Sequence, residues 1–595
     1  MAYKQYVLVC CGTGCESTKS REVVNALTEE AAKAGLAGDV QIVKTGCFGF
    51  CEKGPIVKVL PEETFYVQVK PADAKEIVAE HLVKGRPVAR LLYDSTQSKA
   101  HAKLEDIDFY QKQVRVVLRN CGVIDPDSID EYIARDGYVA LEKVLFEMQP
   151  DDVLAELKKS GLRGRGGAGY PTWLKWKFTK DVESDEKFVM CNADEGDPGA
   201  YMDRSTLEGD PHSIIEAMMI AGYTCGSTHG VIYIRAEYPL AIERLKNAIA
   251  QAKEYGLMGK GILGTDFSFD IEIRLGAGAF VCGEETALIA STEGGRGMPI
   301  PRPPFPAVKG LWGKPTVINN VETWASIPVI IMRGGDWYAK IGTETSKGTK
   351  VFALTGKINN SGLIEVPMGT TLRDIIYGIG GGIRGGKKFK AVQTGGPSGG
   401  LIPAEYLDTP IDYENLAKLG SIVGSGGMIV MDEDDCVVDI TKFYLDFSVE
   451  ESCGKCAPCR IGGRTLLNLL EKIAAGNGTG DDIATMQKLS TAMQKASLCG
   501  LGQTTPNPVL SVIRHFNDEL MSHIDDKKCP AGKCSKLVTF TIDKEACIGC
   551  TVCARRCPVN CISGERKLPH EIDQSRCIKC GECLAACKFN AVLKS

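Results

Sequence analysis

The last fifty residues contain two nearly identical cysteine runs, and these runs constrain the fold more strongly than any other feature of the chain. Each run places four cysteines at gaps of two, two and three residues. The cysteines are Cys547, Cys550, Cys553 and Cys557, followed by Pro558, and then Cys577, Cys580, Cys583 and Cys587. A disulfide-rich tail and a pair of zinc knuckles are the alternatives, but zinc motifs rarely supply eight cysteines in two interlocked runs. We therefore expect this segment to fold around inorganic clusters.

The spacing resembles that of bacterial ferredoxins with two [4Fe–4S] clusters, in which the fourth cysteine of each run ligates the other cluster. We therefore assign one cluster to Cys547, Cys550, Cys553 and Cys587, and the other to Cys577, Cys580, Cys583 and Cys557. A tail of this kind transfers electrons.

The bulk composition is that of a globular protein with about four domains. Apolar residues make up 44% of the 595 residues and charged residues 24%, both ordinary values. A net charge of -5 gives no reason to expect nucleic acid as a partner. The first residues lack the pattern of a signal peptide, and no apolar run is long enough to span a membrane. We expect a cytoplasmic protein without a membrane partner.

Two residue types are unusually frequent. The 25 cysteines indicate metal ligation in a reducing compartment, since disulfide scaffolds suit small secreted domains. The 66 glycines gather in loops at 161–200, 275–297 and 379–427, where the interspersed apolar residues argue against flexible linkers. Such loops bring the backbone close to ligands.

Residues 1–85 are predicted to form a thioredoxin-like α/β domain. We expect strands at 6–9 and 39–43, a hairpin at 56–60 and 64–69, and a helix at 20–34 capped by Ser17 or Thr18. Four thiolates on two loops of this unit fit a [2Fe–2S] cluster: Cys10, Cys15, Cys47 and Cys51. Cys11 competes with Cys10 for the first position. A redox dithiol is the other interpretation, but no Cys-x-x-Cys precedes the helix.

Residues 86–115, including Ser95 to Lys99, are expected to be a connector, and 116–345 a ligand-binding domain. A glycine loop there contains Gly164, Gly166 and Gly169 in the spacing of a dinucleotide fingerprint. The preceding segment, 151–160, has helical periodicity, so the usual fingerprint context fails. The loop still leads into a predicted helix, and Pro171 is suited to the first turn of that helix. Backbone N–H groups at such a helix start can bind a phosphate.

Charged and amide side chains surround this loop in the sequence. Arg163, Arg165 and Lys175 add positive charge beside it. A buried strand at 188–191 is followed by acidic and amide residues. The carboxyl end of such a strand is where α/β folds bind ligands, and an exposed acidic turn is the alternative interpretation. Glu284 and Glu285 fall at a helix N-terminus, where their charge is stabilised.

Four motifs together resemble the flavin-bearing, NADH-oxidising subunit of respiratory complex I: Gly-Arg-Gly-Gly-Ala-Gly-Tyr-Pro-Thr, Asn-Ala-Asp-Glu, Cys-Gly-Glu-Glu-Thr and Pro-Pro-Phe-Pro. The resemblance covers about residues 115–520. It implies that FMN contacts Gly164, Gly167, Lys175, Asn192, Asp194, Gly283, Glu284, Asn319 and Asn320. It further implies that NADH stacks among Tyr170, Phe178 and Phe305, near Glu195, Asp197 and Arg302, with Glu195 as the catalytic candidate. Asp197 and Phe280 replace the family's usual Glu and Tyr, which affects nucleotide contacts.

The segments that follow carry further structural and metal-binding expectations. Residues 346–430 resemble the small β-grasp (SLBB-like) domain of that family, and 431–525 are predicted to be helical. Four cysteines there fit another [4Fe–4S] cluster, with zinc as the alternative: Cys453, Cys456, Cys459 and Cys499. Three further residues suit a structural zinc ion between this domain and the ferredoxin tail at 526–595, or are simply free: His523, Cys529 and Cys534. Most other cysteines are expected to be buried apolar residues: Cys11, Cys121, Cys191, Cys225, Cys282, Cys436 and Cys561.

The domain order has a chemical meaning. Flavin accepts a hydride and releases single electrons, so FMN beside clusters links a nicotinamide cofactor to one-electron carriers. The whole chain resembles the beta subunit of NAD(P)-dependent electron-bifurcating [FeFe]-hydrogenases, a multidomain α/β and α+β protein. That resemblance implies an H-cluster-bearing catalytic subunit, a small thioredoxin-like [2Fe–2S] subunit and ferredoxin as partners. The alternatives are the diaphorase subunit of an NAD(P)-linked formate dehydrogenase, a non-catalytic electron-wiring subunit, and a complex I component, which the extra head and tail disfavour.

Overall fold

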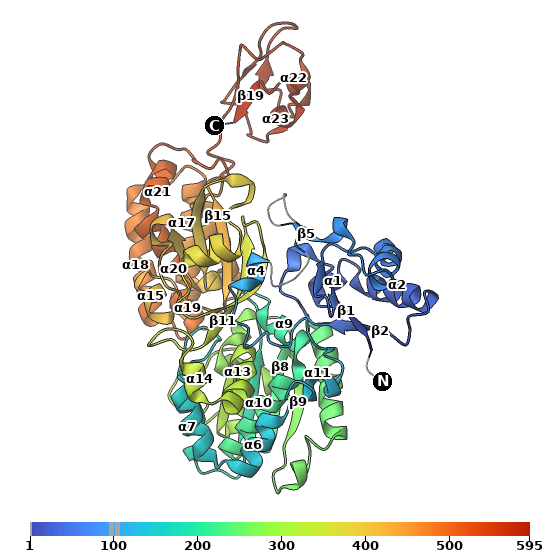
Figure 1. Cartoon of the computed structure of the whole chain (residues 1–595). Coiled ribbons are helices and arrows are strands. Elements are labelled where there is room, and N and C mark those ends of the chain that lie inside the picture. The colour runs from blue at the N-terminus through green and yellow to red at the C-terminus, as the bar shows by residue number, and fades with distance from the viewer. Residues whose placement is uncertain (1–2, 95–99, 102–106, 595) are drawn as a thin grey trace. The chain divides into compact units, whose positions relative to one another are not determined.

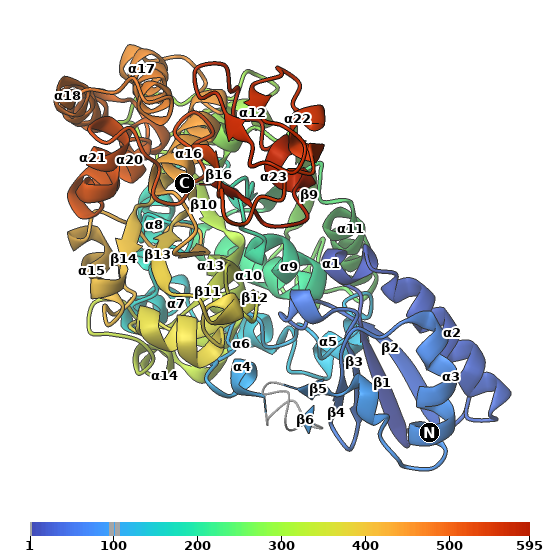
Figure 2. The same cartoon turned by 90° about the horizontal axis from the view of Figure 1, so that it is seen from above.

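The computed structural model describes residues 3–94, 100–101 and 107–594, and it divides the chain into two compact units (Figures 1 and 2). The first comprises Met1–Lys387 and Ala391–Val430, and the second Lys388–Lys390 and Met431–Ser595. The predicted connector segment Ser95 to Lys99 lies outside the described residues. The described part of the connector includes the antiparallel pair β5 (Tyr93–Asp94) and β6 (Ala100–His101), and helix α4 (Asp108–Gln111).

The N-terminal sheet has the order β2-β1-β3-β4, with β1 parallel to β2 and antiparallel to β3. Its strands are β1 (Gln5–Cys10), β2 (Val40–Thr45), β3 (Val57–Leu60) and β4 (Thr64–Tyr66). Helix α2 (Ser20–Lys33) packs its apolar face on this sheet, as expected. Its predicted cap is wrong: Lys19 occupies the N-cap at φ 74°, while the hydroxyls of Ser17 and Thr18 donate backwards to carbonyl groups.

The next sheet is entirely parallel and has the order β10-β7-β8-β9. Its strands are β7 (Phe188–Ala193), β8 (His229–Arg235), β9 (Asp270–Gly276) and β10 (Thr316–Asn320). The chain adds β8 and β9 on one side of β7 and then returns to place β10 on the other side. The carboxyl ends of β7 and β10 therefore flank a topological switch point, where open α/β sheets bind their ligands.

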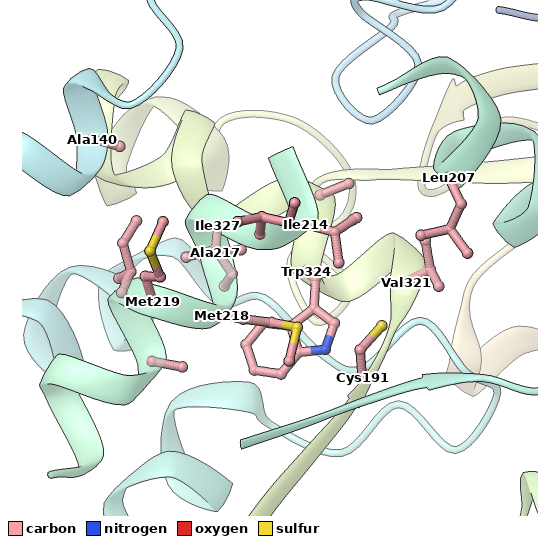
Figure 3. Packing of buried hydrophobic residues seen from close by; sticks show 14 of the residues in the cluster. Ala140, Cys191, Leu207, Ile214, Ala217, Met218, Met219, Val321, Trp324 and Ile327 are labelled. Carbon is pink, nitrogen blue, oxygen red and sulfur yellow. The ribbon is translucent and has the colours of Figure 1, made fainter. Parts of the chain in front are cut away.

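Three helices pack against these strands. The helices are α8 (Thr172–Asp181), α10 (Pro211–Cys225) and α13 (Val321–Arg333). Helix α10 is apolar on nearly every side and buried along almost its full length, as such a pattern requires. Trp324 of α13 lies close to Met218 of α10 and Cys191 of β7 (Figure 3), and its ring is 5.6 Å from that of Trp176.

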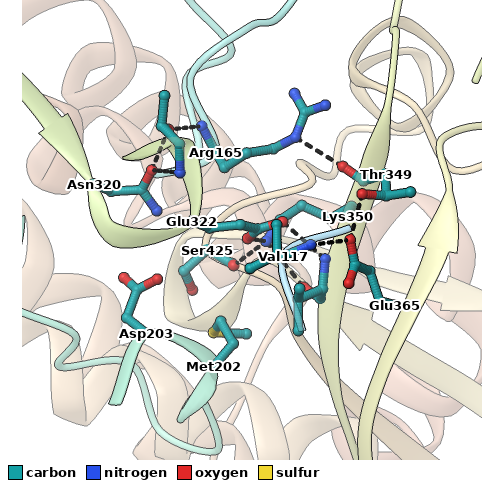
Figure 4. A network of polar contacts seen from close by, with 12 residues as sticks. Val117, Arg165, Met202, Asp203, Asn320, Glu322, Thr349, Lys350, Glu365 and Ser425 are labelled. Carbon is teal, nitrogen blue, oxygen red and sulfur yellow. Dashed lines mark hydrogen bonds and ion pairs between the residues drawn. The ribbon is translucent and has the colours of Figure 1, made fainter. Parts of the chain in front are cut away.

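A mixed sheet of order β12-β11-β15-β13-β14 follows. Its strands are β11 (Thr349–Gly356), β12 (Gly362–Pro367), β13 (Phe389–Thr394), β14 (Leu401–Pro403) and β15 (Gly427–Asp432). A buried polar network joins this sheet to α13 (Figure 4). Lys350 Nζ donates to Glu322 and to the carbonyl groups of Val351 and Ser425, so this buried charge is fully paired.

The second unit begins with a helical domain and ends with a small cysteine-rich domain. The helices are α16 (Val437–Glu450), α17 (Ala457–Ala474), α18 (Gly480–Ala496), α19 (Gly500–Thr504), α20 (Asn507–His515) and α21 (Asn517–Ile524). The cysteine-rich domain pairs β16 (Phe540–Ile542) with β19 (Val592–Lys594) and β17 (Ile562–Ser563) with β18 (Glu571–Ile572), and adds α22 (Val552–Arg556) and α23 (Glu582–Ala586). No helix among the described residues is both long and apolar enough to cross a membrane.

Candidate functional site

The glycine loop between α7 (Pro150–Ser160) and α8 closes on itself. Gly164 N donates to Tyr170 O at 2.8 Å, and Arg163 forms a bridge with Pro171. Glycine is required at Gly169, because its φ is 63° and an added Cβ would lie 2.7 Å from the ring of Tyr413. Pro171 immediately precedes α8 rather than lying in its first turn. These contacts place the closed loop directly ahead of a helix N-terminus, where anion sites form.

Arg165 braces this loop from inside the protein. Its side chain is 1% exposed, and the guanidinium donates to the carbonyl groups of Arg163, Lys347 and Thr349. We expected Arg165 to add charge beside a phosphate. Because its donors are engaged by backbone carbonyls, we assign its side chain to the shape of the loop instead.

Three asparagines stand at the carboxyl ends of the two strands that flank the switch point: Asn192, Asn319 and Asn320. Asn192 and Asn320 are register partners at the ends of β7 and β10, and Asn192 Nδ2 donates to Gly283 O at 2.9 Å. Asn320 caps α13 by accepting from Thr323 N. A Cβ on Gly166 would lie 3.3 Å from that of Asn320, so the glycine loop lies directly against β10. The Asn319 amide is oriented so that its nitrogen donates to Ile318 O and its oxygen accepts from Trp176 Nε1 at 2.9 Å.

A charged group forms another part of the site. Lys175 Nζ lies 3.2 Å from Glu285 Oε2, and Arg302 donates to Glu285 Oε1 at 2.6 Å. Burial raises the pKa of Glu285, but the two cations outweigh burial and lower it. The Arg302 guanidinium lies 5.7 Å from the Phe305 ring, while Glu284 caps α12 (Glu285–Thr292) as expected. These contacts therefore connect four predicted site residues in a chain that runs from Lys175 through Glu285 and Arg302 to Phe305.

Three predicted aromatic residues keep exposed rings. Tyr170 is 44% exposed, Phe178 47% and Phe305 54%. Rings of this size are usually buried, and exposed aromatic rings suit stacking on a planar ligand.

The two acids after β7 are held by protein groups. Glu195 is 6% exposed and accepts from Asp203 N and Arg204 N, at 3.0 and 3.1 Å, at the start of α9 (Met202–Gly209). Burial raises the pKa of Glu195 despite these bonds. Asp197 accepts from Ser425 Oγ, and burial raises its pKa to about 6.

The remaining predicted residues line the same loops. Asp194 pairs with Arg235 at 3.3 Å, and a Cβ on Gly283 would lie 3.3 Å from Asp194 O. Phe280 packs so tightly on Gly196 that a Cβ there would lie 2.9 Å from its ring.

The four N-terminal thiols of the predicted [2Fe–2S] set are neighbours. Cys47 Sγ is 3.7 Å from Cys51 Sγ, and the neighbouring thiols of Cys15 and Cys47 act with burial to raise the pKa of Cys10. Cys11 instead belongs to the apolar core of this domain, where burial raises its pKa to about 11. The geometry favours Cys10 over Cys11.

The [4Fe–4S] sets are also brought together within the second unit. Cys459 in α17 is surrounded by Cys453, Cys456 and Cys499. In the cysteine-rich domain, one cavity is lined by Cys547, Cys550, Cys553 and Cys587, and the other by Cys557, Cys577, Cys580 and Cys583. The crossed assignment of the fourth cysteines matches these two cavities.

One residue of the possible zinc site is not predicted from the sequence. Cys436, expected to be a buried apolar residue, contributes a fourth donor to His523, Cys529 and Cys534, and the four donor atoms lie within 4.8 Å of one another. Cys436 Sγ is 3.4 Å from His523 Nε2. His523 Nδ1 lies 2.8 Å from Glu519 O, an arrangement that orients a ligating imidazole. No local spacing signals Cys436, because it stands 87 residues before His523.

Comparison with known proteins identifies these domains. Family models match as the Nuo51 FMN-binding domain over residues 157–329, the NADH-ubiquinone oxidoreductase-F iron-sulfur binding region over 439–523, and the SLBB domain over 351–402. A thioredoxin-like [2Fe-2S] ferredoxin model matches 2–82, and a 4Fe-4S dicluster model 539–588. An F-type subunit of the NADH-quinone oxidoreductase of Rhizobium meliloti is 43% identical over 415 residues, 70% of this chain and 99% of the relative. The chain belongs to the NADH-quinone oxidoreductase F family.

Relatives of the chain also include hydrogenase subunits. The NADP-reducing hydrogenase subunit HndC of Solidesulfovibrio fructosivorans is 60% identical over 460 residues, 77% of this chain and 94% of that one. A crystal structure of an NAD+-reducing [NiFe]-hydrogenase matches with a TM-score of 0.62 and 29% identity, over 88% of this chain and 85% of that one. These findings confirm both predicted resemblances and the predicted domain types. The chain is an NADH dehydrogenase-type oxidoreductase subunit with FMN-binding, [2Fe–2S] and [4Fe–4S] domains.

Proposed function

We propose that this chain is the NAD(P)H-oxidising and NAD(P)+-reducing subunit of a multisubunit electron-bifurcating hydrogenase. The observation that carries the proposal is the contact of the glycine loop with Asn320, the register partner of Asn192 at the carboxyl ends of β10 and β7. The name of HndC, 60% identical, supports a hydrogenase as the assembly. FMN, when bound, would exchange a hydride with the nicotinamide and single electrons with the clusters.

Each group of residues has a proposed task at this site. Those proposed to bind FMN are Gly164, Gly167, Lys175, Asn192, Asp194, Gly283, Glu284, Asn319 and Asn320. Tyr170, Phe178 and Phe305 would stack on NAD(H) or NADP(H), and the Arg302 and Glu285 pair would meet its polar groups. Glu195 would fix the loop after β7 beside the nicotinamide, so that the chain orients the reacting rings and excludes water.

The electron route and domain boundaries are also part of the proposal. We propose one [2Fe–2S] and three [4Fe–4S] clusters in the cysteine sets described above. The proposed boundaries are 1–85, 86–115, 116–345, 346–430, 431–525 and 526–595. The proposed partners are a catalytic subunit with an H-cluster, a small thioredoxin-like [2Fe–2S] subunit and ferredoxin, in the cytoplasm.

An anaerobic assay of the purified chain tests the flavin function. The chain is reconstituted with iron, sulfide and FMN, and viologen reduction is measured with NADH and NADPH in parallel. Activity with bleaching of the cluster absorbance is the expected result and identifies the preferred nucleotide. Absence of bound FMN at full iron content would replace the proposal with an electron-wiring role. A co-purifying formate dehydrogenase in place of a hydrogenase would change the assembly but not the diaphorase role.

We further propose a structural zinc ion at Cys436, His523, Cys529 and Cys534. Three sulfur donors and one imidazole, all buried, suit tetrahedral Zn²⁺. Cys436→Ser should abolish zinc measured by plasma mass spectrometry while leaving the iron content unchanged. Cys225→Ala, at a buried cysteine outside every proposed ligand set, should keep the zinc. Zinc retained in Cys436→Ser, or absent from the intact chain, contradicts this site.

A further inference from the structure

The two cavities of the cysteine-rich domain differ by one thiol. The first is lined by four cysteines, the number that a cubane cluster requires. The second is lined by five, because Cys561 stands beside the four predicted ligands. Cys561 is buried, at 4% exposed, as its sequence context predicts. Its surroundings, however, are the predicted ligands of a cluster.

Cys561 lies between two of these ligands. Its Sγ is 3.4 Å from Cys557 Sγ, and its backbone N donates to the same sulfur at 3.3 Å. Cys561 and Cys577 also line the same cavity. A turn places Cys561 beside Cys557, since Asn560 N donates to Cys557 O. The Cys561 sulfur is therefore adjacent to the position from which Cys557 would hold iron.

We propose that Cys561 is a reserve ligand of the second [4Fe–4S] cluster and takes the place of Cys557 when that thiolate is lost. The inference rests on the proposed cluster function of this domain. With both cysteines present, Cys561 would donate its S–H to the Cys557 thiolate. In the exchange, the iron bond to Cys557 breaks, an iron bond to Cys561 forms, and the Cys561 proton passes to the Cys557 sulfur or, in a chain that lacks that sulfur, to solvent. No electron is gained or lost.

The first cavity provides a matched control within the same domain. Cys587 has the corresponding place in its cavity, as the fourth cysteine of the other run, and no fifth cysteine lines that cavity. Cys557→Ala and Cys587→Ala therefore remove equivalent ligands, one with a neighbouring thiol and one without.

The experiment compares iron, sulfide and reduced-cluster EPR spin counts in full-length reconstituted chains. Cys557→Ala should retain the wild-type cluster content, whereas Cys587→Ala and the double variant Cys557→Ala/Cys561→Ala should each lose one cluster. Loss of a cluster in Cys557→Ala alone overturns the inference. Retention in the double variant also overturns it, because a solvent ligand would then suffice, as does retention in Cys587→Ala. A retained [2Fe–2S] signal and bound FMN verify that each variant has folded.

The intact chain separates this inference from the function on which it rests. If the intact chain never binds both clusters of the cysteine-rich domain, the proposed cluster function fails. If it binds both and Cys557→Ala does not, only the reserve-ligand inference fails.

Discussion

Glu195 shows how one residue is positioned by bonds that its own neighbourhood in the sequence does not reveal. Its carboxylate accepts two backbone N–H groups from the first turn of α9, and Tyr238 donates its hydroxyl to Glu195 O at 2.8 Å. These bonds fix the loop that follows β7. The negative charge matters because both N–H donors and the N-terminal end of a helix favour an anion.

Replacing this charge should impair the nucleotide site. In Glu195→Gln the side-chain NH2 group would face one of the two backbone N–H donors and could not accept from it. The loop would therefore lose a charge-assisted hydrogen bond worth about 1.5–3 kcal/mol. We expect NADH-dependent viologen reduction to fall about tenfold or more. The measurement is kcat/KM for NADH, with iron and FMN content as controls. Unchanged turnover with NADH would remove Glu195 from the nucleotide site.

Asp197 gives a prediction about pH. Its pKa is raised to about 6 in the folded chain, chiefly by burial, against an ordinary value near 3.8. A raised carboxyl pKa means that the folded state prefers the protonated acid. The contribution to stability is therefore full below about pH 4 and is lost as pH rises through about 6.

Asp197→Asn removes the cost of burying a charged carboxylate above about pH 6, and it keeps a side-chain oxygen that can accept from Ser425. We expect its apparent Tm to exceed that of the wild type at pH 8 and to equal it at pH 4. Thermal unfolding of both proteins over this range measures the effect. A constant Tm difference at all pH values would show that Asp197 is not the titrating group.

At the scale of elements, α9 connects two sites. Its first N–H groups hold Glu195, and its last turn contacts the thioredoxin-like domain, where Glu208 accepts from Thr13 N at 3.0 Å. Gly46 and Gly209 lie so close that a Cβ on Gly46 would be 2.3 Å from Gly209 Cα. Tyr201, just before α9, lies beside the thiol of Cys51, one of the proposed [2Fe–2S] ligands, and acts to lower the pKa of that thiol. The helix therefore links the loop after β7 to the cysteine loop.

The tyrosine hydroxyl should influence the potential of that cluster. A hydrogen bond to a ligating sulfur stabilises the more negative reduced form, so removing it lowers the reduction potential. Tyr201→Phe should give a more negative midpoint in an EPR-monitored redox titration of the [2Fe–2S] signal. Tyr110→Phe is the matched control, because Tyr110 donates to Phe48 O on the same loop and has no such bond to sulfur. Equal shifts in both variants would assign the effect to loosening of the loop.

At the scale of the whole molecule, buried charges specify how neighbouring domains pack. Lys350 begins the β-grasp sheet and Glu322 lies on α13 of the flavin-binding domain, and both side chains are almost fully buried. Glu322 also accepts from Val351 N, and Lys350 reaches Ser425 O (Figure 4). Each charge is paired and hydrogen-bonded, which a buried ion pair requires.

Breaking this pair should be costly. Lys350→Met leaves Glu322 buried without its partner and should lower the free energy of unfolding by about 3–5 kcal/mol. Urea denaturation followed by tryptophan fluorescence measures the loss. The control is Lys253→Met, whose pair with Asp270 is exposed and worth about 1 kcal/mol or less. Lys350→Met/Glu322→Leu should recover much of the loss, and equal losses in Lys350→Met and Lys253→Met would contradict the assigned role.

Local patterns in the sequence predicted several elements and many ligand sets. The prediction that 431–525 are helical anticipated α17 and α18, and the apolar run at 188–191 identified β7. Cysteine spacing grouped the predicted cluster ligands because those ligands lie on short loops or beside a helix end. The amides at the end of β7 were recognised because parallel strands present their carboxyl ends to ligands.

Only the tertiary structure decided the relations between distant segments. Cys436 reaches His523 across 87 residues, Arg165 turns inward to Thr349 O of β11, and Asp197 turns to Ser425. Cys561 is close in sequence to Cys557, but its position beside Cys577 depends on how the two cysteine runs pack. Spacing and periodicity describe which side chains share a helix face, a strand face or a loop. Which of those faces meet is decided by the packing of whole elements, and a single stretch of sequence does not contain that information.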